Sequence, residues 1–198
     1  MAHEHEHEEH EYDREAELTE EEVQAEAERL VRKELALSQI RQYGDPVLRM
    51  RADEVVEFDE ELHDVSERMF QLMHDAEGVG LAATQVGILR RFFVCALDGE
   101  DRLLVNPVVT PAGTDSDVDT EGCLSLGSVR VPVERATKVT LEARDAEGNA
   151  VSLELEGYPA RVVQHEVDHL DGKLMLDRTD PEARREALGR LRPRLVLS

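Results

Sequence analysis

The chain has 198 residues and carries 45 acidic against 23 basic side chains, so its formal net charge is −22. A surface this acidic argues against general binding of nucleic acid, and we expect no sequence-specific nucleic-acid partner. With two cysteines, no apolar run long enough to span a bilayer and no signal-peptide pattern at its N-terminus, the sequence predicts a cytoplasmic protein without a membrane partner.

Composition divides the chain into an acidic extension (1–37), a globular part (38–180) and a basic C-terminal helix or tail (181–198). Residues 1–38 hold 14 acidic and 4 basic side chains, and therefore −10 of the net charge. The first dozen residues have no apolar anchor, so we expect partial disorder there.

A charged surface helix is predicted within the extension, over residues 18–37. Apolar side chains recur there near helical spacing, and Thr19 with Glu22 forms the sequence pattern of a capping box. We expect this helix to dock only loosely on the rest of the protein.

The segment HEHEH at residues 3–7 fits the pattern His-Glu-x-x-His, which can bind a metal ion when a helix presents both histidines on one face. Its neighbours are acidic, and no apolar face would orient the imidazoles. We therefore interpret this copy as a solvated polar tail, with loose metal binding as the alternative.

The globular part begins with a turn-rich segment and an amphipathic helix. Over residues 59–76, apolar side chains recur at spacings of three and four, which predicts that helix. Five later runs are rich in β-branched residues or alternate apolar with polar, as strands do: RFFVCAL, LLVNPVV, VRVPVE, KVTLEAR and VSLELEG. DAEGN predicts a hairpin turn between the last two.

A further helix is predicted to begin near Pro159 and to end at Gly172, since proline suits a first helical turn and glycine a helix end. This helix bears the second copy of His-Glu-x-x-His, in QHEVDHLDG at residues 164–172. The order of elements predicts an α+β fold, in which mostly antiparallel sheets pack around this central helix.

On that helix, His165 and His169 would lie one turn apart on the same face, so both imidazoles could reach one ion. Glu166 would lie beside them, placed to meet a water there. An apolar stripe can bury the helix and hold the imidazoles still: Val163, Val167 and Leu170. The alternative is a core helix in which both histidines are hydrogen-bonded within the protein. The amphipathic pattern and the helix limits at Pro159 and Gly172 favour a metal site.

A catalytic site of this kind usually has a third protein ligand and one open position. No histidine follows His169, although several carboxylates do. Upstream, Cys123 lies in EGCLS beside a turn, and its thiolate would complete a His₂Cys site. The alternative for Cys123 is a small buried apolar residue, which is the interpretation that fits Cys95 inside an apolar strand.

Three segments occur in the order of the signature motifs of the peptide deformylase family, which they resemble: GVGLAATQVG (78–87), EGCLS (121–125) and QHEVDHLDG (164–172). GDPVLR at 44–49 resembles the opening segment of that family, and the resemblance covers roughly residues 38–180. It implies a metal-dependent hydrolase that removes the formyl group from the N-terminal formyl-methionine of newly made polypeptides.

The resemblance implies one divalent ion on Cys123, His165 and His169, most often Fe²⁺, with Zn²⁺, Ni²⁺ or Co²⁺ as possible substitutes. Glu166 would take a proton from the attacking water and deliver it to the leaving amine. The Gln85 side chain and the backbone N–H of Leu124 would stabilise the oxyanion.

The methionine side chain requires an apolar pocket, for which Val79 and Val162 are the candidates, with Tyr158 at its rim. Gly80 would let the backbone approach the substrate closely. Each of these residues could equally belong to the core. The family motif also suggests that Glu121 pairs with Arg130 and braces the Cys123 loop.

Two other classes of protein are alternatives to this assignment. Other His-Glu-x-x-His metallopeptidases recruit a third ligand after the second histidine, so Cys123 argues against that class. A protein that only binds formylated N-termini or stores metal is disfavoured by the intact Glu166 and Gln85. Because the extension lies apart from every motif, we expect residues 1–37 to be dispensable for catalysis on a short peptide.

The C-terminal stretch EARREALGRLRPR, residues 182–194, holds five arginines against two glutamates. Pro181 could start a helix there, with an apolar side formed by Ala187, Leu188 and Leu191. Its arginines could pair with acidic neighbours. Alternatively, since the substrate is a chain emerging from the ribosome, they could dock on ribosomal RNA phosphates.

Overall fold

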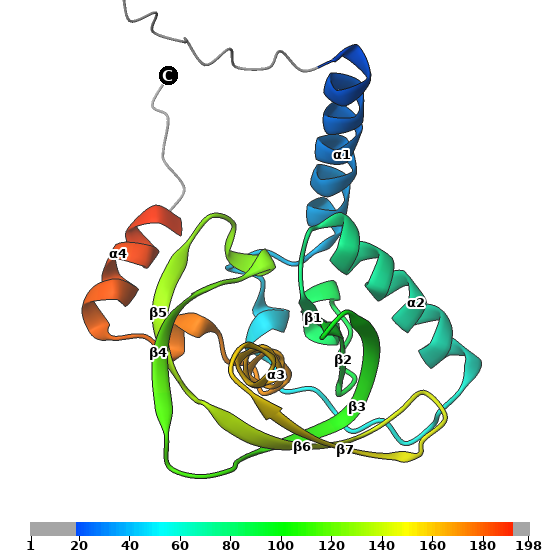
Figure 1. Ribbon diagram of the computed structural model, residues 1–198, viewed down its shortest axis with the longest axis vertical. Coiled ribbons are helices and arrows are strands. Elements are labelled where there is room, and N and C mark those ends of the chain that lie inside the picture. The colour runs from blue at the N-terminus through cyan, green and yellow to red at the C-terminus, as the bar shows by residue number, and fades with distance from the viewer. Residues whose placement is uncertain (1–18, 192–198) are drawn as a thin grey trace, which may run out of the picture.

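The computed structural model describes residues 19–191 (Figure 1). The HEHEH segment and residues 192–198, with Arg192 and Arg194 of the basic stretch, lie outside the described residues. The helices are α1 (Glu20–Gln39), α2 (Glu60–Asp75), α3 (Tyr158–Leu170) and α4 (Pro181–Leu191). No helix of this part of the chain has the length and apolar character needed to cross a membrane.

Two antiparallel sheets make up the β-structure of residues 19–191. The strands are β1 (Gly80–Ala82), β2 (Phe92–Leu97), β3 (Glu100–Pro111), β4 (Ser116–Gly122), β5 (Arg130–Ala136), β6 (Lys138–Arg144) and β7 (Ala150–Glu156). Five of them form a sheet in the order β1-β2-β3-β6-β7, while β4 and β5 pair only with each other.

Helix α3 lies between the two sheets, and Figure 1 shows it almost end-on at the centre of the molecule. Its apolar face, with Ala160, Val163 and Leu170, packs against Phe93 and Leu141 of the larger sheet. Its other side faces β5. The prediction of an α+β fold around the His-Glu-x-x-His helix is confirmed, and the helix packs against strands of both sheets.

Strand β4 was not predicted from the sequence, because it has no apolar alternation. Six of its seven residues are exposed, and Glu121 is the buried one. The strand is held by its pairing with β5, in which Glu121 lies opposite Val131 and Gly122 opposite Arg130. This pairing brings the EGCLS segment to α3.

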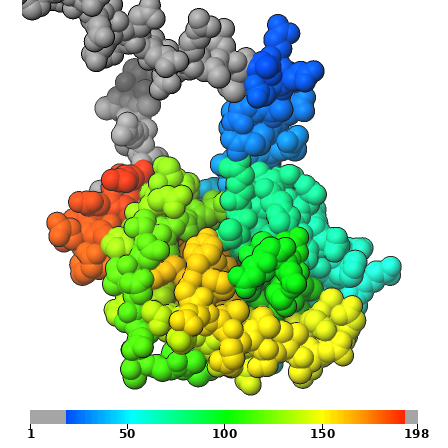
Figure 2. All heavy atoms as spheres, viewed as in Figure 1, coloured from blue at the N-terminus to red at the C-terminus, as the bar shows by residue number. Residues whose placement is uncertain are grey.

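Helix α1 has the predicted capping box, in which the Thr19 hydroxyl accepts a hydrogen bond from the Glu22 N–H. The helix continues two residues beyond the predicted end, to Gln39, and only Ala36 of its residues is fully buried. In the space-filling view α1 rises from the body beyond α2 (Figure 2). It packs by its C-terminal end, where Leu37 joins the core between α2 and the sheet.

Helix α4 begins at Pro181, as predicted. The predicted apolar side is present: Ala187 is buried, and Leu188 and Leu191 pack in the same cluster as Val129 and Leu174. The helix therefore covers the outer side of the β4-β5 sheet and leaves its arginines at the surface.

Candidate metal centre

One thiol and two imidazoles converge at the junction of β4 and α3. The ligand atoms of Cys123, His165 and His169 all lie within 4.8 Å of one another. The two Nε2 atoms are 3.2 Å apart, and the Sγ of Cys123 is 3.3 Å from Nε2 of His169. Cys123 follows the last residue of β4, while one turn of α3 separates the histidines, so the sheet pairing and the helix together assemble the group.

These three donors fit a divalent transition ion. A thiolate and two imidazoles bind Fe²⁺ or Zn²⁺ readily, and three protein ligands leave a coordination position for substrate or water. Nδ1 of His165 lies 2.9 Å from Oε2 of Glu121, which leaves Nε2 free to face the other donors. A histidine that binds a metal through one ring nitrogen commonly donates a hydrogen bond from the other to a carboxylate.

Glu166 lies beside the three donors without belonging to their group. It is 4% exposed, and burial raises the pKa of its carboxyl to about 7. Among residues 19–191, its buried Oε2 has no hydrogen-bond partner. Buried carboxylate oxygens rarely remain unpaired, so this atom is available to a water or a substrate group.

Gly80 makes room for that carboxyl group. A Cβ atom on residue 80 would lie 2.4 Å from Oε1 of Glu166, closer than any real contact. Likewise, a Cβ on Gly78 would lie 2.8 Å from Cδ1 of Leu124. Gly78 and Gly80 thus let this segment run close to the side chains of Leu124 and Glu166.

The amide of Gln85 is oriented by its own neighbours. Its Oε1 accepts a hydrogen bond of 2.8 Å from the backbone N–H of Ala82, which can only donate. The NH₂ group therefore points the other way, 3.1 Å from the Ser125 hydroxyl and 3.7 Å from the Sγ of Cys123. A donor fixed in this way faces the metal-ligand group.

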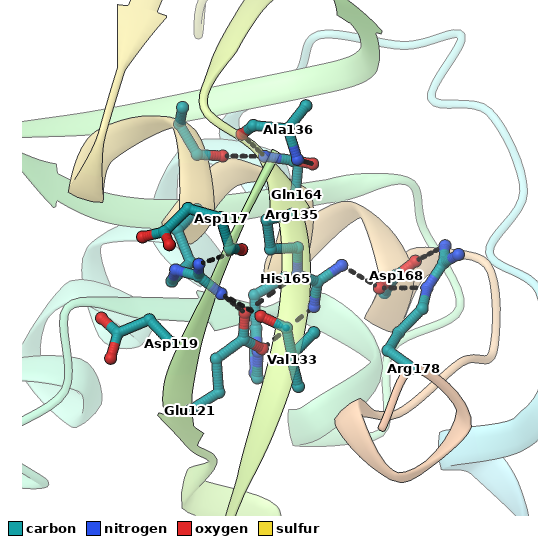
Figure 3. A network of polar contacts seen from close by, with 12 residues as sticks. Asp117, Asp119, Glu121, Val133, Arg135, Ala136, Gln164, His165, Asp168 and Arg178 are labelled. Atoms are coloured by element: carbon teal, nitrogen blue, oxygen red, sulfur yellow. Dashed lines mark hydrogen bonds and ion pairs between the residues drawn. The ribbon is translucent and has the colours of Figure 1, made fainter. Parts of the chain in front are cut away.

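Glu121 is the carboxylate that braces the site, but its partner is not Arg130. Arg135 binds both Glu121 oxygens, at 2.9 and 3.0 Å, and Arg161 adds a third contact at 3.0 Å (Figure 3). Arg130 is exposed and lies opposite Gly122. The predicted pair was wrong because the register of β4 and β5, which the sequence does not reveal, decides which arginine faces inward.

Burial raises the pKa of Glu121, but hydrogen bonds with His165 and Arg135 more than offset this and hold it at about 2. The network continues from Arg135 to Asp168 at 2.5 Å, and from Asp168 to Arg178 at 2.5 and 3.0 Å (Figure 3). Buried ions therefore tie β4 and β5 to α3 and hold His165 in position.

Sequence reasoning missed Arg135, Arg161 and Asp168. A signal existed for two of them. Arg135 continues the alternation of Val131 and Val133, which are both buried, and so it occupies an inward position of β5. Arg161 lies one turn before His165 on α3, hence on the same face.

A cleft of about 710 Å³ opens beside the metal-ligand group. Its lining includes every candidate for catalysis or substrate binding: Val79, Gly80, Gln85, Leu124, Tyr158, Val162 and Glu166. Cys123 and His165 also reach it, whereas His169 lies deeper and is 1% exposed. Val79 is 40% exposed and Tyr158 is 62% exposed, while Val162 is buried.

The extension contacts this cleft. Lys33 and Leu37 of α1 line it, and Lys33 also pairs with Glu77, the residue before the first motif. Our expectation that the extension lies apart from every motif was therefore wrong for the C-terminal half of α1. No local sequence pattern indicates this contact, because it depends on how α1 packs on α2.

The α+β fold brings a buried thiol and two imidazoles together, and an acid lies beside them on the His-Glu-x-x-His helix. This arrangement defines a metal-dependent hydrolase. The profile described as Polypeptide deformylase matches residues 37–185. The chain belongs to this family, and it is a hydrolase that removes the formyl group from newly made polypeptides.

Similar proteins agree with this assignment. Peptide deformylase 1 of Corynebacterium efficiens is 48% identical over 162 residues, which cover 80% of this chain and 96% of that protein. The crystal structure of the Thermotoga maritima peptide deformylase matches at 46% identity with a TM-score of 0.70, covering 72% of this chain and 97% of the other. A Synechococcus elongatus peptide deformylase in complex with actinonin matches at 38% identity, with a TM-score of 0.73 and coverage of 76% and 84%.

Proposed function

We propose that Cys123, His165 and His169 hold one divalent ion, natively Fe²⁺, and that this site hydrolyses the formamide of an N-terminal formyl-methionine. The observation that supports this most strongly is the convergence of the three donor atoms within 4.8 Å, beside a buried carboxylate and a cleft. When bound, such an ion lowers the pKa of a water and polarises a carbonyl oxygen. Zn²⁺, Ni²⁺ and Co²⁺ suit the same donors.

Glu166 is the proton carrier in this proposal. It lies on α3 between the two histidines, and its Oε2 has no hydrogen-bond partner within the described part of the chain. The carboxylate can accept a proton from the attacking water and return it to the amine that leaves. The absence of a side chain at Gly80 leaves the space that the carboxyl group occupies.

Gln85 and Leu124 supply the hydrogen bonds that stabilise the oxyanion. The Gln85 NH₂ is fixed by Ala82 and faces Cys123, and Leu124 opens a short 3₁₀ turn directly after Cys123. The N–H groups at the start of such a turn point away from it and are free to donate. Each fixed donor contributes about 3 kcal/mol to the stability of a transition state.

The cleft also supplies the specificity for methionine. Val79 and Val162 give it an apolar wall near the metal-ligand group, and Tyr158 lies at the exposed rim. A flexible apolar side chain fits such a wall, because it loses water contact there without leaving polar groups unpaired.

Docking on the ribosome is the further part of this proposal, with the cytoplasm as the place of action. Arg184, Arg185 and Arg190 are exposed on α4, although Arg184 lies 3.5 Å from Asp177. A helix bearing these charges could bind RNA phosphates, with an affinity that falls steeply as salt rises. Because Ala187 anchors α4 to the core, Arg185→Glu with Arg190→Glu tests docking better than a truncation would. Co-sedimentation with ribosomes at low salt should then be lost, and unchanged binding would contradict the idea.

Release of formate is the test of the hydrolytic reaction. Protein loaded with Fe²⁺ without oxygen should release formate from formyl-Met-Ala and leave a free N-terminus on the dipeptide. Acetyl-Met-Ala is the matched control, because its larger acyl group should not be cleaved at a comparable rate. No formate with any of the four ions would contradict the proposed function.

A further inference from the structure

The two groups proposed to stabilise the oxyanion belong to separate segments of the chain. Gln85 lies in the short 3₁₀ helix after β1, whereas Leu124 opens the 3₁₀ turn after β4. The side chains of Gln85 and Ser125 are in contact, but within residues 19–191 no strand pairing joins β1 to β4. Further contacts must therefore set the position of one donor relative to the other.

Residues 41–43, which follow α1 and which we term the bridging segment, contact both of these segments. The backbone N–H of Arg41 donates to the carbonyl oxygen of Gln85 at 2.7 Å. The backbone N–H of Tyr43 donates to the carbonyl oxygen of Ser125 at 2.8 Å. One short piece of chain thus joins the segment of the first oxyanion donor to that of the second.

The side chain of Gln42 completes the bridge. Its Nε2 lies 3.1 Å from the carbonyl oxygen of Leu124 and 3.2 Å from that of Ile40. Both partners can only accept, so the NH₂ group must face them and can give one N–H to each. The local contact with Ile40 therefore supports the orientation in which Gln42 reaches Leu124.

The contact with Gln42 is made at the second of two adjacent peptide groups in the turn. The carbonyl oxygen of Cys123, whose peptide group contains the Leu124 N–H, accepts a hydrogen bond of 3.0 Å from the Leu126 N–H. Gln42 binds the next carbonyl oxygen, that of Leu124. Two soft torsions link these peptide groups, so fixing the second one restricts the direction of the Leu124 N–H.

Gln42 reaches the proposed oxyanion donors from behind the cleft. Gln85 and Leu124 are among the described residues that line the cleft, whereas residues 41–43 are not. A bound peptide would therefore meet the two donors and not the Gln42 side chain. Any effect of Gln42 on the reaction must pass through the turn that it holds.

We propose that Gln42 is a positioning residue, which aims the Leu124 N–H at the oxyanion by holding the Leu124 carbonyl group. This role rests on the proposed function, because it assumes that an oxyanion forms beside Leu124. An oxyanion exists only after water has attacked, so a misplaced donor should lower kcat and leave KM nearly unchanged.

Gln42→Met tests this role, because methionine is similar in length and has no N–H to donate. Gln42 is exposed, so the loss should be that of one modest hydrogen bond. We expect kcat for formyl-Met-Ala to fall about 3- to 10-fold at normal metal content. KM should stay within about twofold of the native value.

Gln42→Arg is the rescue variant, because Nε of arginine stands as many bonds from Cα as Nε2 of glutamine and also donates. Measured at a salt concentration that screens the added charge, it should recover most of the lost kcat. Gln39→Met is the matched control. The Gln39 side chain contacts Leu35 and Arg68, on α1 and α2, and this variant should keep the native kcat.

Amide hydrogen exchange of the folded variants gives a second readout that does not depend on activity. The Leu126 N–H closes the turn on Cys123, so its exchange should be about 3- to 10-fold faster in Gln42→Met. Gln39→Met should leave this rate at the native value. Exchange that is unchanged in Gln42→Met would show that Gln42 does not hold the turn.

Three kinetic results would also overturn the role of Gln42. These are a native kcat in Gln42→Met, a change confined to KM, and a kcat in Gln42→Arg as low as in Gln42→Met. Failure of the proposed function looks different. In that case the native chain releases no formate with any of the four ions, whereas the exchange of the Leu126 N–H still reports whether Gln42 holds the turn.

Discussion

The cleft is bounded by two charged regions that are built in opposite ways. Behind the metal-ligand group, Glu121 and Arg135 are each about 5% exposed and belong to a network that joins β4, β5 and α3. The exposed pair of Lys33 on α1 and Glu77 after α2, which we term the α1 edge, has side chains that are 34% and 38% exposed. Buried charges must keep their partners, whereas exposed charges can exchange theirs for water.

The two charged regions therefore have different structural roles. The buried network fixes His165 and the Cys123 loop, and a small shift there would misplace a metal ligand. The α1 edge is exposed, so a change there should cost little stability. Variants in the two regions should therefore differ in their effect on stability.

The largest expected effect is on stability in the buried network. Arg135→Ala leaves Glu121 and Asp168 without their shared cation, and should lower the free energy of unfolding by about 3 to 5 kcal/mol. Arg130→Ala is the control, since Arg130 is exposed and should cost within about 0.5 kcal/mol. Urea denaturation measures both. Equal losses would mean that Arg130, as first expected, is the relevant partner.

The second effect is a dependence of stability on pH. The pKa of Glu121 is about 2 in the folded protein and near 4.5 when exposed, so its ionised form stabilises the fold. This contribution, about 3 kcal/mol, is fully present above pH 4.5 and is lost as the pH falls towards 2. Denaturation curves measured from pH 6 to pH 2 should show the loss. In Arg135→Ala the decline should be smaller, and an identical decline would contradict this account.

The third effect is on turnover. Glu166→Ala should still bind metal but lose activity by at least about a hundredfold, the scale of general acid–base catalysis. Formate release and elemental analysis of the same sample measure the two properties. Near-normal turnover would exclude Glu166 as the proton carrier, and loss of the metal would make it a ligand.

The smallest effect is expected at the α1 edge. Glu77→Gln removes the carboxylate that Lys33 and Arg29 share, yet should change the free energy of unfolding by no more than about 1 kcal/mol, as exposed ion pairs do. The same urea assay measures it. A loss as large as that of Arg135→Ala would show that α1 is part of the rigid frame and would remove the contrast between the two regions.

Helices with a regular apolar spacing or a capping pattern were predicted from the sequence. The spacing of His165, Glu166 and His169 on an amphipathic stretch predicted α3, and the capping pattern at Thr19 predicted α1; both are confirmed. β4 could not be predicted, because a strand with one buried residue has no apolar alternation to detect.

Contacts between distant segments were harder to predict than elements. That Cys123 meets the histidines was implied by resemblance to a family and not by any spacing within this chain. The inward position of Arg135 depends on strand register, and the contact of Lys33 with Glu77 depends on how α1 packs on α2. Strand register and tertiary packing decide such contacts, and the local patterns of a single sequence do not specify them.

The metal content of two cysteine variants tests whether Cys123 is a ligand of the ion. Cys95 is buried in β2 within the apolar core, and burial raises the pKa of its thiol, so it is a poor metal ligand and serves as the matched control. After purification with Fe²⁺ in the absence of oxygen, Cys95→Ala should retain close to one ion per folded chain, and Cys123→Ala should lose most of it. Equal retention by the two folded variants would contradict the assignment of Cys123, His165 and His169 as the metal site.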